Sequence, residues 1–211
     1  MTLLHRFAAP AELDPVQREN YINVQVDAIG VGIANAAAPF LPVFLARMAA
    51  TNFQIGLLTS MPALTGLLLS IPLGSFLQSR RNIVPWFSAT RLGVVLCYAL
   101  TGIASMLLPD RWIIPAVLAI WALATIPQNM LSICFSVVMN AVAGSKGRFE
   151  LMTRRWSILG LTTAITVFLI GQRLEAIAFP VNYQQVLTAV SIGGILSFLF
   201  SRRIVIPDAP P

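Results

Sequence analysis

The 211-residue chain is 57% hydrophobic and only 10% charged, with a formal net charge of +6. A soluble domain carries about 25% charged residues, so water is excluded as the main solvent of this chain. The apolar runs are long and lack the alternation of barrel strands, which leaves α-helices that cross a lipid bilayer. The basic residues are spread between these runs and form no single patch, which argues against nucleic acid as a partner.

The first helix is predicted to start at Asp14-Pro15-Val16-Gln17, with Asp14 as N-cap and Gln17 closing a capping box. Its membrane part is expected at residues 22–46, and further spans are expected at 53–77, 85–108, 113–142, 151–172 and 183–201. The fold class is therefore an all-α integral membrane domain of six transmembrane helices over 22–203. A polar segment (1–21) precedes it and a short tail (204–211) follows.

The orientation follows from the distribution of arginine and lysine, which favour the cytoplasmic side of a membrane. Ten basic residues fall on one side of the predicted topology: Arg6, Arg18, Arg80, Arg81, Lys146, Arg148, Arg154, Arg155, Arg202 and Arg203. The other side has only Arg47, Arg111 and Arg173. We therefore expect both termini in the cytoplasm, and a multi-pass protein of the bacterial inner membrane.

Polar side chains inside the predicted spans point to a site, because an unpaired polar group in lipid is costly. Gln128, Ser132, Ser136 and Asn140 recur every four residues and share one helix face, with Asn129 beside them. At a rise of about 1.5 Å per residue, the side chains near the bilayer midplane are Asn35, Gln128, Asn129 and Thr162. They either line a substrate pathway or join neighbouring helices by hydrogen bonds, and for serine and threonine the second role is the more common.

Asp27 and Arg91 are the charged residues that fall well inside the predicted spans. A structural ion pair between them is the favoured interpretation, and a proton-coupling role for Asp27 is the alternative. Glu150 and Arg154 have the i, i+4 spacing of a helical ion pair. With Arg148 and Arg155 they are expected to form a charged cluster at the cytoplasmic end of the fifth span, as a lipid anchor or a gate.

Motifs that carry catalysis are missing from the sequence. The one histidine, His5, lies outside the spans, and there is no Gly-x-Ser-x-Gly nucleophile, His-Glu-x-x-His zinc motif or Walker loop. Cys97 and Cys134 both fall in apolar runs and have no metal-binding spacing. We therefore expect no enzymatic activity, no cofactor and no metal site.

The sequence resembles the N-terminal six-helix half of a major facilitator superfamily (MFS) transporter over about residues 20–208. The resemblance is carried by the six-helix layout, by Pro39-Phe40-Leu41-Pro42, and by the short loop after the second span. The family's loop signature is roughly Gly-x-x-x-Asp-Arg-x-Gly-Arg-Arg. The matching stretch here keeps Gly74 and the basic pair Arg80 and Arg81, but has Gln78 at the acidic position and a shorter loop.

The resemblance implies two inverted three-helix repeats, a midplane site, and a cytoplasmic gate. Its gate residues would be Gly74, Arg80, Arg81, Glu150 and Arg154, with Glu150 in place of the family's missing acid. The partner surface would lie on the first, second, fourth and fifth spans. The chain would then be a fragment, pair with a second six-helix half, or serve as an accessory subunit.

The leading functional hypothesis is a half-size or truncated MFS permease that moves a small solute by alternating access. The alternative is a non-transporting structural or assembly subunit of a larger membrane complex. Both hypotheses require the lipid bilayer and a second membrane subunit as partners, and only the first requires a solute.

The topology is testable by labelling single cysteines after Cys97 and Cys134 are replaced by serine. In the Arg80→Cys variant, a membrane-impermeant maleimide should react only in inverted vesicles, because the second loop is predicted to be cytoplasmic. The Arg111→Cys variant should react only in intact cells stripped of their outer membrane. Labelling from the opposite sides would reverse the orientation.

Overall fold

The computed structural model describes residues 14–206, and parts of the predicted N-terminal segment and tail lie outside these residues. Within 14–206 the chain forms helices and no strand. Six helical stretches are long and apolar enough to cross a membrane, which confirms the predicted number and order of spans. Their bounds are Pro15–Arg47, Asn52–Gln78, Val84–Leu107, Asp110–Gly144, Gly147–Ala176 and Val181–Ser201.

The first span is broken into two helices, α1 (Pro15–Asn35) and α2 (Phe40–Arg47), where one helix was predicted. Pro39 has no N–H for the carbonyl of Asn35, so the backbone tightens into i→i+3 turns. The N–H of Ala38 donates to the Asn35 carbonyl at 3.0 Å instead. Because of this break, Asn35 lies at a helix end and its side chain is exposed.

The capping box at a helix N-terminus forms at a different helix from the one predicted. Asp14 is the N-cap of α1 and Pro15 follows it, but the Asp14 side chain makes no capping hydrogen bond, so the predicted capping box is wrong. A complete capping box forms instead at α3 (Asn52–Gln78), where Thr51 and Gln54 exchange side-chain and backbone bonds. The Thr51-x-x-Gln54 spacing is the sequence signal for it.

The remaining helices are α4 (Val84–Leu107), α5 (Asp110–Ala176), α6 (Val181–Ala189) and α7 (Ser191–Ser201). α5 contains two spans, because Gly144 takes φ 63° and ψ −176° and reverses the chain there. A positive φ is tolerated by glycine, which has no Cβ. We call Asp110–Gly144 the first arm of α5 and Gly147–Ala176 the second arm. α6 and α7 together form the sixth span, with a short interruption at Val190.

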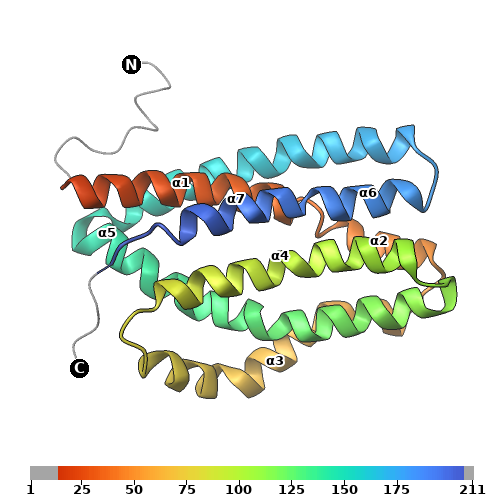
Figure 1. Cartoon of the computed structure of the whole chain (residues 1–211), viewed down its shortest axis with the longest axis horizontal. Coiled ribbons are helices and arrows are strands. Elements are labelled where there is room, and N and C mark those ends of the chain that lie inside the picture. The colour runs from red at the N-terminus through yellow and green to blue at the C-terminus, as the bar shows by residue number, and fades with distance from the viewer. Residues whose placement is uncertain (1–13, 207–211) are drawn as a thin grey trace.

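The described chain begins and ends at the same end of the bundle (Figure 1). There the Asn20 amide donates to the Val205 carbonyl at 2.6 Å and accepts from the Val205 N–H at 2.8 Å. Tyr21 donates to the Gly147 carbonyl at 3.3 Å at this end. The basic-residue pattern predicted this arrangement, in which the chain crosses the membrane an even number of times and its Arg-rich loops lie at one end. The side of the membrane on which they lie stays a prediction.

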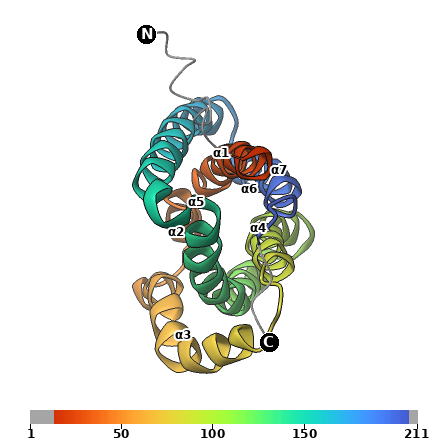
Figure 2. The ribbon, with the colours of Figure 1, turned by 90° about the vertical axis from the view of Figure 1, so that its left-hand side faces the viewer.

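α1 and α7 lie side by side (Figure 2), and glycines allow their close approach. A Cβ on Gly30 of α1 would lie 2.6 Å from the Ser197 backbone nitrogen of α7, and one on Gly193 would lie 2.7 Å from the Gly30 carbonyl. Small residues let helix backbones approach and gain dispersion energy where the hydrophobic effect does not act. The α1–α7 contact is therefore a backbone-to-backbone packing surface.

The Gly30→Leu substitution should destabilise the protein by about 1–3 kcal/mol or more, because the added side chain meets backbone atoms that cannot rotate away. Gly160→Leu is the matched control, since nothing lies within 4 Å of the position of its Cβ. Thermal unfolding in a mild detergent measures both. Equal melting temperatures for the two variants would contradict the close α1–α7 packing.

Candidate functional site: a buried charge cluster beside a polar cavity

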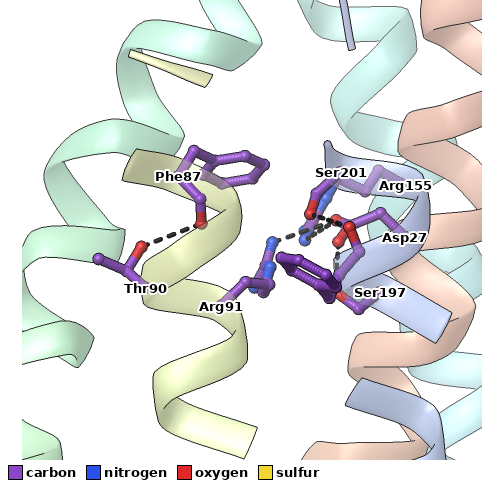
Figure 3. Close-up of polar contacts among 8 residues, drawn as sticks. Asp27, Phe87, Thr90, Arg91, Arg155, Ser197 and Ser201 are labelled. Carbon is purple, nitrogen blue, oxygen red and sulfur yellow. Dashed lines mark hydrogen bonds and ion pairs between the residues drawn. The ribbon is translucent and has the colours of Figure 1, made fainter. Parts of the chain in front are cut away.

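The predicted ion pair between Asp27 and Arg91 is present, with Arg91 Nη2 3.1 Å from Asp27 Oδ2. The structure adds two partners to it (Figure 3). Arg155 Nη2 lies 3.4 Å from the same carboxylate oxygen, and the Ser197 hydroxyl donates to Asp27 Oδ1 at 2.5 Å. We call these four residues the Asp27 cluster. They come from α1, α4, the second arm of α5, and α7, so one carboxylate joins four of the six spans.

Arg155 is the residue that sequence reasoning missed. It was placed in the charged cluster at the cytoplasmic end, but its side chain is 3% exposed and points to Asp27, so that placement is wrong. Neighbouring residues on a helix are turned by about 100° about its axis, so Arg154 and Arg155 face different surroundings. Arg154 pairs with Glu150 as the i, i+4 spacing predicted. The available sequence signal was the spacing, because Arg155 falls at i, i+4, i+7 with the apolar Leu151 and Ile158, and the structure buries all three.

The Asp27 cluster borders two adjoining hollows of about 220 and 230 Å³, which together we call the polar cavity. Both hollows are lined by Asn35, Arg91 and Gln128, together with Val31 and Leu131. One extends towards α7 and includes Ser197, and the other extends towards the second arm of α5 and includes Arg155 and Trp156. The sequence had predicted Asn35 and Gln128 for such a pathway, and the fold brings them together with the ion pair.

Asn35 and Gln128 do not connect neighbouring helices by hydrogen bonds. Within residues 14–206 neither side chain makes a hydrogen bond, although Asn35 is exposed and Gln128 half-buried. Their amides are therefore available as donors and acceptors to whatever occupies the cavity. Ser132, which follows Gln128 by one helical turn, lines the cavity as well, and Ser136 and Asn140 continue this exposed polar stripe along the first arm of α5.

Asn129 and Thr162 lie at helix contacts instead of in the polar cavity. The Asn129 amide donates to the Thr125 carbonyl at 2.9 Å and to the Pro62 carbonyl of α3 at 3.4 Å. The side-chain oxygen of Asn129 lies against Gly66 of α3. Thr162 packs against Gly32 of α1. For these two residues the structure favours helix–helix packing over a pathway role.

The predicted gate residues form two separate groups in this structure. Gly74, Arg80 and Arg81 line a third hollow of about 380 Å³ with Ile206. The Arg80 guanidinium lies 4.3 Å from the centre of the Phe76 ring and 5.4 Å from that of Trp86. Glu150 pairs with Arg154, so the expected Glu150 contact with Arg80 or Arg81 is replaced here by a pair within α5. Side-chain contacts of Lys146 lie outside what the structure describes.

Aromatic rings cover the two buried guanidiniums. Arg91 lies 5.0 Å from the centre of the Phe87 ring, and Arg155 lies 4.6 Å from that of Phe135. The negative face of an aromatic ring attracts a cation and so partly offsets its removal from water. Neither ring carries the counter-charge that a second carboxylate would supply.

Six apolar helices, glycine-mediated packing and a buried ionic cluster define a multi-pass α-helical membrane protein. Comparison with protein-family models, curated proteins and solved structures finds no match to this chain.

Replacing Asp27 with Asn should destabilise the protein by about 3–5 kcal/mol, because it leaves two buried guanidiniums without their counter-charge. Glu150→Gln is the control for loss of one carboxylate, and it should change stability by less than about 1 kcal/mol because that pair is exposed. Unfolding by sodium dodecyl sulfate in mixed micelles, followed by circular dichroism, measures the difference. Similar small effects of both variants would show that the Asp27 cluster contributes little.

Proposed function

We propose that this chain is a six-helix unit of a secondary transporter, which moves a small solute by alternating access together with a second six-helix unit. The observation that carries the proposal is the Asp27 cluster beside the polar cavity. Ionisable residues within membrane spans are rare and typically mark substrate or ion pathways. A unit whose only role was packing would gain nothing from two unbonded amides and an uneven set of charges at the same cavity.

The exposure of the spans supports a partner unit. The second and fifth spans are the least buried, with 6% and 11% of their most apolar windows buried inside the chain, against 44% for the third and sixth. The polar stripe of Ser132, Ser136 and Asn140 is exposed on the fourth. Serine and asparagine at membrane depth need a protein or aqueous neighbour, so a second six-helix unit on this face would complete the cavity. A second copy of this chain or a separate half would serve.

The MFS assignment belongs to this proposal. Its support is the six-span layout, the short loop between α3 and α4, and the placement of Asn35 and Gln128 in one cavity. The gate at Gly74, Arg80, Arg81, Glu150 and Arg154 also belongs to it, with the present pair of Glu150 and Arg154 as one of its states. The inverted three-helix repeat is part of the same proposal.

The exposed polar stripe also favours the second candidate function, an assembly subunit of a larger membrane complex. Such a subunit would use Ser132, Ser136 and Asn140 to bind its partner and would move no solute. The two functions differ in their dependence on Asn35 and Gln128, because both line the cavity and neither belongs to the set of Ser132, Ser136 and Asn140 that would bind the partner.

Gln128→Leu and Asn35→Leu should each lower solute flux about tenfold or more, because each removes the hydrogen bonds that an amide in the cavity wall offers to the solute. The measurement is uptake of radiolabelled alanine, glucose and lactate into liposomes that contain the purified chain with any partner that copurifies. Ser191→Leu is the control, since it makes the same type of change on the sixth span, outside both the cavity lining and the proposed partner surface.

Each result has a defined consequence. Flux that falls in the cavity variants and persists in Ser191→Leu supports transport. A chain that moves none of these solutes, yet keeps its partner through size-exclusion chromatography in both cavity variants, supports the assembly subunit and overturns the transport proposal.

A further inference from the structure

We propose that the polar cavity binds a small, singly charged organic anion, a carboxylate, through Arg91 and Arg155. This inference rests on the proposed function, because it names the chemical class of the solute for the same site. It is carried by three observations: the sum of the buried charges, the unpartnered N–H groups of both arginines, and the composition of the cavity wall.

The buried charges do not balance. Among the described side chains, those of residues 14–144 and 147–206, the buried charged ones are Asp27, Arg91 and Arg155, with residue exposures of 0%, 7% and 3%. Two guanidiniums against one carboxylate leave a net charge of +1, because arginine stays protonated in proteins. An uncompensated charge in a low-dielectric interior is strongly unfavourable, and aromatic contacts offset only a part of this penalty. One negative charge in the cavity would restore neutrality.

Both arginines have a hydrogen-bond donor to spare. The Nε atoms of Arg91 and Arg155 are buried and have no hydrogen-bond partner. Each residue lines the polar cavity, Arg91 on both of its hollows and Arg155 on one. Asp27 engages only the Nη2 atom of each guanidinium. The planar fork of arginine matches the two oxygens of a carboxylate, so the unused donors suit this group in particular.

The rest of the cavity wall suits the body of an organic acid. Asn35 and Gln128 supply unbonded amides for a polar substituent. Val31, Leu131 and Trp156 supply an apolar surface. Ligand sites typically combine such apolar walls with a few oriented polar groups. A volume of about 220–230 Å³ for each hollow limits the occupant to a small molecule.

The test is binding of sodium benzoate to the purified full chain in an uncharged maltoside detergent, by isothermal titration calorimetry at constant ionic strength. Benzamide has the same shape without the charge, and benzylamine carries the opposite charge. We expect benzoate to bind at least about tenfold more tightly than benzamide, since a charged hydrogen bond in a buried site contributes that much. Equal binding of benzoate and benzamide overturns the proposal.

Variants that change the charge of the site decide the mechanism. Arg155→Gln leaves Asp27 and Arg91 as a neutral pair, so benzoate binding should fall about tenfold or more while the fold is kept. Arg202→Gln is the matched control, because it removes the same charge from an exposed position and should bind benzoate as the wild type does. Unchanged benzoate affinity in Arg155→Gln overturns the assignment.

Asp27→Asn raises the net charge of the site to +2, so it should favour phthalate, a dianion built on the same ring, over benzoate by about tenfold. Preference for benzoate in this variant would contradict the charge balance. If the variant does not fold, the Arg155→Gln comparison with Arg202→Gln decides alone.

A lipid phosphodiester offers the same single negative charge as a carboxylate solute. Benzoate binding is therefore repeated in phosphatidylcholine nanodiscs with and without phosphatidylglycerol. Binding that phosphatidylglycerol leaves unchanged supports a soluble anion. Loss of benzoate binding in its presence assigns the cavity to a lipid headgroup and overturns the solute class.

Binding and flux separate this inference from the proposed function. Benzoate binding without flux of any solute in liposomes keeps the anion site and overturns transport. Flux of alanine or glucose without selective benzoate binding keeps transport and overturns the anion site.

Discussion

The Asp27 carboxylate is the contact on which the arrangement of the helices depends. It receives Arg91 from α4, Arg155 from the second arm of α5, and Ser197 from α7. In a bilayer-spanning bundle an ion without partners is strongly unfavourable, so these helices must lie where their side chains can reach one position on α1. Gly30, one turn from Asp27, makes this geometry accessible: its missing Cβ lets α7 approach until Ser197 touches α1. The electrostatic contact and the close packing are thus two parts of one constraint.

The two sides of the bundle are built differently as a consequence. Beside the Asp27 cluster, α7 packs against both α1 and α4, and α1 also packs against α5. In contrast, α3 contacts mainly α5 and lies at the edge of the bundle. The contact to α3 depends on Asn129, which fills the space beside Gly66 and bonds to the Pro62 carbonyl. Between these two regions the first arm of α5 carries Gln128 and Ser132 into the polar cavity. Side chains on one face of this helix, such as Asn129, therefore contact α3, and side chains on another face, such as Gln128 and Ser132, line the cavity.

Much of the fold could be predicted from the sequence, because span number and loop positions follow from apolar length and from Arg, Gly and Pro at the breaks. The Asp27–Arg91 pair could also be predicted, since two opposite charges inside spans have few other partners. Depth along a helix does not give direction around it, which is why Asn129 and Thr162 could not be separated from Asn35 and Gln128. The same limit hid Arg155, because a tandem arginine pair near a loop resembles an interfacial anchor. Pro39 lacks the N–H that would bond to the Asn35 carbonyl, but the sequence alone does not show whether a span bends or breaks at such a proline.

Because two arginines share one carboxylate, ligand binding to the arginines can be linked to helix packing, which a simple ion pair would not allow. Arg91 at 3.1 Å and Arg155 at 3.4 Å compete for the same oxygen, Asp27 Oδ2, from helices that belong to different halves of the six-span unit. The proposed anion, bound through both guanidiniums, would share their positive charge with Asp27 and so weaken the attraction of each arginine to that carboxylate. A ligand shifts a conformational equilibrium only by its difference in affinity between two arrangements, and competition for a shared counter-ion supplies such a difference. Under the proposed function, occupancy of the polar cavity would therefore be linked to the packing of α4 and α5 against α1 through a single carboxylate, without a separate relay of residues.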